Sequence, residues 1–271
     1  MATETRPFKG DWALILGASS GFGEATALEL ANLGMNIFGV HLDRKATLPN
    51  VERITEEIHR VGCEAVFFNG NAADPDKRKE VLEAIKKRLG GTAPPQTVRV
   101  LLHSLAFGTL KPFIAKSPSE TISKPQLDMT LDVMANSLVY WVQDLVADRL
   151  MAQGGRVFAM TSAGGARVWS SYGAVSAAKA ALESHIRQLT LELAPLGITA
   201  NAIMAGVTDT PALRKIPGSE QMMELARRKN PSGRLTTPRD VAQAIGLLSR
   251  PESQWLTGNV VCVDGGEFVV D

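Results

Sequence analysis

The sequence predicts an α/β fold: a single doubly wound domain in which helices cover both faces of a parallel, seven-stranded sheet. Short apolar runs alternate with helical stretches along nearly the whole chain, as in folds built from repeated strand–helix units. The apolar runs are continuous rather than alternating, which is typical of strands buried on both faces. With 271 residues, 45% hydrophobic and 21% charged, the chain can bury one large core.

The first half of the chain contains four expected strands, each a short apolar run between turn-forming residues, at 12–16, 36–40, 65–68 and 98–102. Helices are expected between them at 24–33, from Pro49 onward, and at 79–89. Pro49 suits a first helical turn, and Ile54, Ile58 and Val61 follow it at helical spacing. The glycine- and proline-containing stretch 90–95 is a connector, because the alternation resumes after it.

The second half continues the same rhythm. Three strands are expected at 155–160, 198–204 and 260–263, with helices at 131–151, 174–193 and 241–248. The segment 207–235 breaks the alternation, since it carries three prolines and only a short helix near 220–228. A long insertion after the carboxyl end of a strand is where a lid would lie, so the prediction is one domain over 1–271 with a substrate-binding lid at 207–235.

Composition excludes several classes of protein. Lysine and arginine number 29 against 28 acidic residues, so the net charge of +1 argues against a nucleic-acid partner. Cys63 and Cys262 stand in separate apolar contexts, and the four histidines (41, 59, 103 and 185) form no ligand pattern, so we expect neither a disulfide framework nor a metal. Residues 1–10 lack a signal-peptide core, and no run is long enough to span a membrane, so a cytoplasmic location is expected.

A glycine-rich turn joins the first strand to the first helix, with the spacing G-x-x-x-G-x-G. Glycines permit a tight turn and let a pyrophosphate approach the backbone at a helix N-terminus. This strand–turn–helix context favours a dinucleotide site of the Rossmann type over a glycine-rich turn without a ligand. The residues expected to bind the cofactor here are Gly17, Ser19, Ser20, Gly21, Phe22 and Gly23.

This glycine spacing resembles that of the short-chain dehydrogenase/reductase family, although Leu16 replaces the usual leading threonine. Asn71 and Ala72 resemble the family's adenine contact, and Asn136 matches its active-site asparagine. The stretches 201–206 and 256–266 resemble later family motifs, with Ala205 in place of a proline. The resemblance covers almost the whole chain and implies further cofactor contacts at Ser104, Leu105, Ala106, Thr208 and Thr210.

The catalytic spacing departs from the family's usual Tyr-x-x-x-Lys. The residue four before Lys179 is Val175, and the nearest tyrosine, Tyr172, lies seven before it. Tyr-x6-Lys, together with the segment 103–107 that begins His-Ser, resembles the enoyl-acyl-carrier-protein reductases of bacterial fatty-acid synthesis. Residues seven apart share one helix face, two turns apart, so both groups can meet one ligand.

The resemblance implies a role for each residue of the site. Lys179 would hold the nicotinamide ribose and favour tyrosinate by its charge, while Tyr172 would stabilise a developing enolate oxygen. Ser162, seventeen residues before Lys179, stands at the family's catalytic serine position, and Asn136 completes the predicted catalytic group. Serine at 162 and the ordinary glycine motif resemble a less common, NADPH-preferring subgroup of enoyl reductases.

Cofactor choice rests on the loop after the second strand. Arg44 and Lys45 suit a 2′-phosphate, which favours NADPH, whereas the neighbouring Asp43 keeps NADH open. The alternative is that these three residues form a solvated turn and do not select the cofactor. Metal is not required for hydride transfer.

On the substrate side, the expected contacts are Ala106, Phe107, Tyr172 and Met222. Methionines and leucines in the lid suit an acyl chain, although a small helix packed on the core explains them equally. The basic residues of the lid suit docking of an acidic acyl carrier protein, although such a run is also typical of a solvated face. The family implies a homotetramer.

The predicted function is therefore NAD(P)H-dependent reduction of the trans-2 double bond of an acyl thioester, in fatty-acid biosynthesis. One alternative is a related reductase acting on a 3-oxoacyl thioester, another carbonyl, or an enoyl-CoA. An alternative of another class is a cofactor-binding regulator without turnover.

Overall fold

A computed structural model describes residues 6–93 and 95–270. The sheet has the strand order β3-β2-β1-β4-β5-β6-β7, and every neighbouring pair is parallel. The strands are β1 (Trp12–Leu16), β2 (Asn36–His41), β3 (Ala65–Asn69), β4 (Val98–His103), β5 (Arg156–Ser162), β6 (Thr199–Ala205) and β7 (Val260–Val263). The order reverses between β1 and β4, which is the switch point where doubly wound folds bind ligands. The predicted fold class is confirmed.

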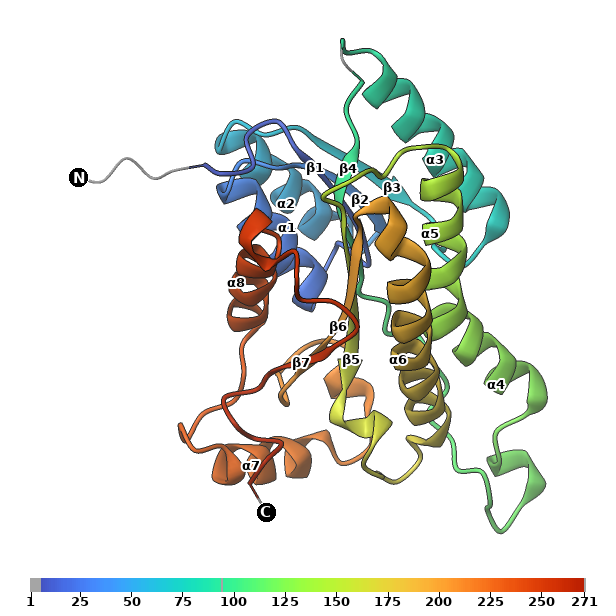
Figure 1. Ribbon diagram of the computed structural model, residues 1–271. Helices are drawn as coiled ribbons and strands as arrows, with labels where there is room; N and C mark the ends of the chain where they lie inside the picture. The colour runs from blue at the N-terminus through green and yellow to red at the C-terminus, as the bar shows by residue number, and fades with distance from the viewer. Residues whose placement is uncertain (1–5, 94, 271) are drawn as a thin grey trace.

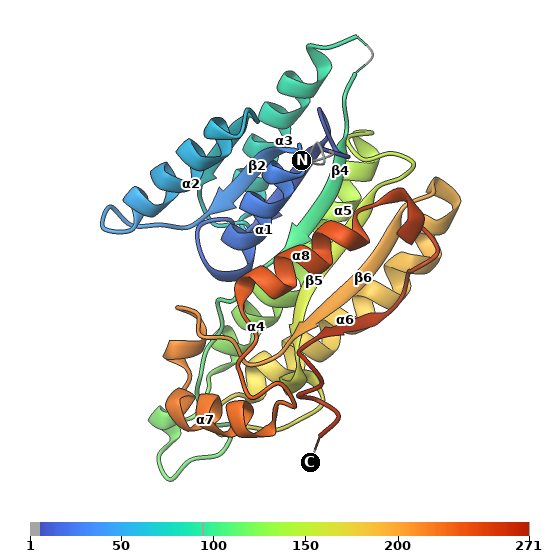
Figure 2. The same ribbon diagram turned by 90° about the vertical axis from the view of Figure 1, so that its left-hand side faces the viewer.

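The α-helices are α1 (Gly21–Asn32), α2 (Leu48–Arg60), α3 (Pro75–Gly90), α4 (Lys124–Leu131), α5 (Ser137–Ala147), α6 (Gly173–Leu193), α7 (Ser219–Lys229) and α8 (Pro238–Leu248). Helices cover both faces of the sheet, whereas α7 lies at its carboxyl edge (Figures 1 and 2). β1 is apolar at every position because its side chains are buried on both faces of the sheet. Leu14 and Leu16 pack in the core cluster formed with α3, α5 and α6, whereas Ala13 and Ile15 pack in the cluster formed with α1, α2 and α8.

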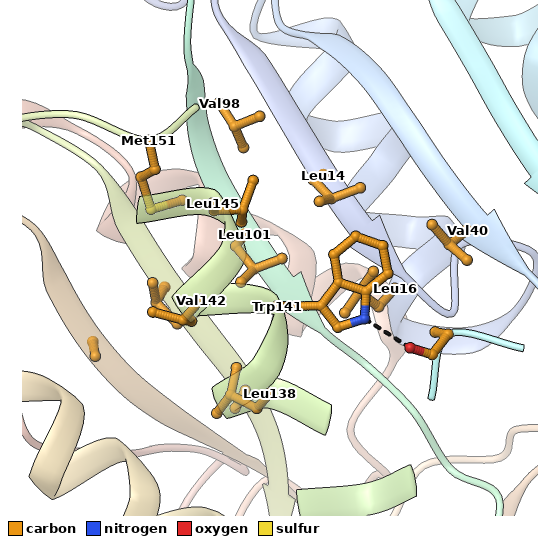
Figure 3. Close-up of a cluster of buried hydrophobic side chains, with 14 of the residues drawn as sticks. Leu14, Leu16, Val40, Val98, Leu101, Leu138, Trp141, Val142, Leu145 and Met151 are labelled. Atoms are coloured by element: carbon orange, nitrogen blue, oxygen red, sulfur yellow. Dashed lines mark hydrogen bonds between the residues drawn. The ribbon is translucent and has the colours of Figure 1, made fainter. Parts of the chain in front are cut away.

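Figure 3 shows the core on the α5 side of the sheet, where Trp141 lies near Leu14 and Leu16. Trp141 is fully buried, and its indole N–H donates to the carbonyl of Ala72, 2.8 Å away. Burying an indole requires a partner for its N–H, so this bond also fixes the loop after β3. The core thereby holds in place one of the segments expected to contact the cofactor.

Several helix bounds differ by a few residues from the sequence prediction, and the helix predicted at 131–151 differs most, at both ends. The helix begins at Lys124, passes through a π-helical segment at Asp132–Asn136, and ends at Ala147. The early start has a local cause, because the Gln126 side chain accepts from the Ser123 backbone N–H at 3.0 Å, as in a capping box. The early end follows from Arg149, whose φ of 55° is outside the helical region.

The segment 207–235 contains a 3₁₀ turn (Leu213–Lys215) and α7, and Figure 1 shows α7 beyond the carboxyl ends of the strands. In the described residues, none of the helices combines the length and hydropathy needed to cross a bilayer. Cys63 and Cys262 are free thiols. Residues 1–5, part of the stretch examined for a signal peptide, and residue 94 of the connector lie outside the described residues.

Candidate active site

The glycine turn lies at the switch point, between β1 and the N-terminus of α1. A Cβ on Gly17 would stand 2.4 Å from the carbonyl oxygen of Ser104, and one on Gly23 would stand 2.0 Å from that of Gly17. Gly17 and Gly21 have φ values of 89° and 58°, which side chains rarely adopt. The turn therefore packs directly on the loop after β4, and glycine is required for that approach.

This turn fits a dinucleotide. The first amides of a helix have no partner within it, and the Ser20 side chain at the N-cap of α1 makes no capping bond. The amides of Gly21, Phe22 and Gly23 are thus placed to bind a phosphate. Thr210 approaches from the lid, since a Cβ on Gly21 would stand 3.5 Å from its Cγ2. Bound there, a nicotinamide dinucleotide supplies the hydride for a reduction.

The end of β2 carries the residues expected to select the cofactor. Arg44 and Lys45 are exposed, whereas His41 is buried with its Nδ1 2.9 Å from the Asp43 carboxylate. Partial burial opposes ionisation of Asp43, but hydrogen bonds from Ser19, Thr47 and His41 outweigh it and lower the pKa of this carboxyl. Asp43 is therefore ionised and already bonded to the glycine turn.

Tyr172 is the N-cap residue of α6, and its hydroxyl lies 3.5 Å from the Ser162 hydroxyl at the end of β5. The tyrosine ring packs closely on the loop after β5, because a Cβ on Gly164 would stand 2.5 Å from its Cε1. Burial raises the pKa of the Tyr172 phenol, and the Ser162 hydrogen bond partly opposes that rise. The phenol is thus protonated at neutral pH and able to donate a hydrogen bond.

Lys179 lies two turns into α6 and is only 5% exposed. Its ammonium donates to the carbonyl of Met160 at 2.7 Å. Burial lowers the pKa of Lys179 to about 8, and the carboxylate of Glu183 partly offsets that effect. Glu183 in turn accepts from the Thr161 hydroxyl at 2.6 Å. The site therefore holds a buried ammonium that loses its proton slightly above neutral pH.

His103 ends β4 and is fully buried. Its Nε2 lies 2.8 Å from the hydroxyl of Ser137, at the start of α5, and its Nδ1 has no hydrogen-bond partner among the described residues. Burial, with the charge of Lys179 as a smaller cause, lowers the pKa of His103 to about 3. The imidazole is therefore neutral, and it links β4 to the helix that follows the π segment.

The other predicted residues are distributed around this centre. Asn136 does not join Tyr172 through its side chain, because its Oδ1 lies 3.1 Å from Nε2 of His185 on α6. The Asn71 side chain accepts from the amide of Ala73 at 3.0 Å, which shapes the loop after β3. Thr208 is buried and donates to the carbonyl of Gly206 at 2.9 Å.

Toward the substrate side, Leu105 packs against the core and Phe107 is 57% exposed on the same loop. Ala106 lies between them, and Met222 is half-buried on α7. Two aromatic residues were missing from the sequence prediction. Phe113 packs on Gly173, where a Cβ would stand 2.7 Å from its ring, and Trp169 contacts the lid. Trp169 could have been noticed as an aromatic residue three positions before Tyr172, whereas no sequence signal places Phe113 near this site.

This fold and site define a dinucleotide-dependent oxidoreductase. A family model described as "Enoyl-(Acyl carrier protein) reductase" matches residues 17–267. The chain therefore belongs to that family, within the short-chain dehydrogenase/reductases.

Similar proteins agree with this membership. The NADPH-dependent aldehyde reductase-like protein of Arabidopsis thaliana is 29% identical over 269 residues, covering 96% of this chain and 95% of its own. The 3-oxoacyl-[acyl-carrier-protein] reductase of Pseudomonas aeruginosa is 28% identical over 264 residues, covering 96% and 98%. The solved structure of the enoyl-[acyl-carrier-protein] reductase (NADH) of Aquifex aeolicus VF5 superposes with a TM-score of 0.83 at 24% identity, covering 97% of this chain and 98% of its own, and shares the fold.

Proposed function

We propose that the protein reduces the trans-2 double bond of acyl thioesters, in fatty-acid biosynthesis, with NADPH as the hydride donor. The observation that carries this proposal is the position of the tyrosine hydroxyl relative to Lys179 along α6. Tyr172 stands at the N-cap, outside the helix, and the position four before Lys179 is occupied by Val175, which is 5% exposed and apolar.

The position of the hydroxyl matters because the two reductions place negative charge at different atoms. Carbonyl reduction forms an alkoxide on the carbon that receives hydride. Enoyl reduction delivers hydride to the β-carbon, so the charge gathers on the thioester oxygen, further along the substrate. A phenol displaced from the helix to its N-cap suits the second arrangement, in which Tyr172 donates a hydrogen bond to the enolate oxygen.

The remaining residues support that donor. The Lys179 ammonium would hold the ribose of the cofactor and supplies a buried positive charge two turns into the helix that Tyr172 caps. Ser162 orients the Tyr172 hydroxyl across their 3.5 Å separation. Asn136 would act through its backbone or through the π segment that carries it, since its side chain is bonded to His185. Lys179 is buried, and exclusion of water from its surroundings strengthens each of these interactions.

NADPH is the proposed cofactor because Arg44 and Lys45 are exposed beside the glycine turn and free to approach a 2′-phosphate. Asp43 opposes this choice less than its charge suggests, since His41 lies 2.9 Å from its carboxylate. Ser19 and Thr47 also stabilise this carboxylate, since both lower the pKa of Asp43.

The proposed partner is an acyl carrier protein that delivers the thioester. Basic residues of the lid support this docking, although Asp209 pairs with Arg214 at 2.7 Å and Glu224 pairs with Arg228 at 2.8 Å. The remaining positive charge would steer an acidic carrier rather than bind it tightly. We also propose a homotetramer, as the family implies.

Parallel assays with crotonyl and acetoacetyl thioesters, each with NADPH and with NADH, test the function. We expect oxidation of NADPH with the crotonyl substrate. Tyr172→Phe should lower kcat/KM by about 100-fold, the order found for removal of one oxyanion donor. Cofactor affinity, measured by fluorescence titration, should change less than about twofold, because the ring packing is retained. Turnover of the acetoacetyl substrate alone would refute the proposal.

Carbonyl reduction is the second candidate, and one observation favours it. Ser162 stands beside Tyr172, as a serine does at the family's carbonyl-reducing sites. Two similar proteins carry names for such reactions, the aldehyde reductase-like protein and the 3-oxoacyl-acyl-carrier-protein reductase. Ser162→Ala separates the candidates, because it should abolish a carbonyl reduction that needs this serine and reduce an enoyl reduction only mildly.

A further inference from the structure

The loop between β5 and α6 ends in a strained turn beside Tyr172. The amide of Tyr172 donates to the carbonyl of Trp169 at 3.2 Å, which closes a turn around Ser170 and Ser171. Ser171 has a φ of 61°, and it is one of two non-glycine residues in the described chain with a positive φ. Such a conformation persists only where the surroundings enforce it.

Trp169 supplies an anchor for this turn, and the anchor is the lid. The indole N–H donates to the carbonyl of Pro217 at 2.9 Å. The ring also lies against Gly218, the N-cap of α7, where a Cβ would stand 3.3 Å from its Cζ2. Gly218 has a φ of 78°, so glycine both permits the helix start and leaves room for the indole.

The other end of the turn has little freedom. The Tyr172 ring packs on Gly164, and the next residue, Gly173, packs under Phe113. A shift of the turn therefore moves the phenol relative to Ser162. Arg167 fastens the same loop to the C-terminal segment, with its guanidinium carbon 4.4 Å over the Phe268 ring. The loop is thus fixed from outside the active site on two sides.

We propose that Trp169 is a positioning residue that couples the lid to Tyr172. With the lid in place over an acyl chain, the indole bond to Pro217 holds the 169–172 turn and aims the phenol at the substrate oxygen. When the lid moves away, the turn loses this support and the strain at Ser171 favours other phenol positions. This inference rests on the proposed role of Tyr172 and adds how substrate binding at the lid affects that residue.

The central test compares two variants with the wild type by steady-state kinetics. Trp169→Phe keeps an aromatic ring and removes the N–H donor, and Trp255→Phe is the matched control, since Trp255 is 94% exposed. We expect Trp169→Phe to lower kcat/KM about fivefold, which corresponds to about 1 kcal/mol. The KM for NADPH should not change, and Trp255→Phe should match the wild type.

Rescue distinguishes positioning from simple loss of packing. Ser171→Gly adopts the positive φ without strain, so the double variant Trp169→Phe/Ser171→Gly should recover to within about twofold of the wild type. A merely destabilised loop would instead be loosened further by glycine, and activity would fall again. Failure of rescue, or equal activity of Trp169→Phe and Trp255→Phe, would overturn the inference.

A second readout does not depend on turnover. Trypsin can cleave after Lys215, which lies in the lid two residues before Pro217. We expect Trp169→Phe to be cut there several times faster than the wild type or Trp255→Phe, and an unchanged rate would count against the coupling. If only the acetoacetyl thioester is reduced, the proposed enoyl activity fails, while the variants are still compared on that substrate. If neither is reduced, the trypsin rates alone decide.

Discussion

Replacing Lys179 by methionine should remove activity while leaving the folded state at least as stable. In the wild type, burial lowers the pKa of Lys179 from 10.5 to about 8. At ~1.36 kcal/mol per pH unit, the folded state below pH 8 therefore carries a cost of about 3 kcal/mol for the buried charge. Methionine has a similar shape and avoids this cost. The variant loses the charged hydrogen bond to Met160, which is worth about 1.5–3 kcal/mol, so the two effects nearly cancel at pH 7.

The wild type and the Lys179→Met variant should also differ in how their stability changes with pH. Between pH 8 and 10.5 the folded state has lost the Lys179 proton and the unfolded state still binds it, so the wild type becomes more stable as pH rises. Lys179→Met lacks this gain. From pH 7.5 to 9.5 the wild type should therefore gain about 2 kcal/mol relative to the variant.

Urea unfolding of both proteins without cofactor, at one protein concentration and at both pH values, measures this difference. A stability difference that stays constant from pH 7.5 to 9.5 would refute the buried-ammonium reasoning. The rate of enoyl reduction by the variant should fall by at least about 100-fold. The wild type would then keep a buried charge that lowers its stability because activity requires it.

The remaining predictions concern acid stability and cofactor choice. The pKa of His103 is lowered to about 3 in the folded state. Between about pH 6.5 and pH 3 only the unfolded state therefore binds this proton, and the free energy of unfolding decreases as the pH is lowered. Between pH 7 and 5 the wild type should lose about 2 kcal/mol more than His103→Gln in urea unfolding, and parallel curves would contradict this. Replacing Arg44 and Lys45 by alanine should raise the KM for NADPH about tenfold and leave that for NADH unchanged, because only NADPH carries the 2′-phosphate. An equal change for both cofactors would refute this role.

Much of the fold could be predicted because its causes are local. The continuous apolar runs follow from burial on both faces, and the glycine turn follows from backbone approaches that leave no room for a Cβ at Gly17 or Gly23. The spacing of Tyr172 and Lys179 likewise fixes their separation along the axis of α6, although Tyr172 itself is the N-cap. These features depend on residues that are close together in the chain, so they can be predicted from the sequence.

The errors and omissions have tertiary causes. The π segment before Ser137 lies where that residue meets His103, which is 34 positions earlier in the chain. The side chain of Asn136 is bonded to His185 because α6 packs there, and no local pattern indicates that pairing. Trp169 contacts Pro217 across 48 positions, so its role is visible only once the loop and the lid are placed together.

The position of Tyr172 connects these tertiary contacts to the proposed chemistry. A tyrosine four before Lys179 would be held by α6 itself, on a helix face facing the core where Val175 now packs. Tyr172 instead precedes the helix, and seven residues at ~1.5 Å rise place it about 10 Å along the axis from Lys179. Its orientation must therefore come from the loop before it, which is fixed by the lid through Trp169 and by Phe268 through Arg167. A hydroxyl that reaches further along the substrate in this way becomes dependent on the segment that covers the substrate.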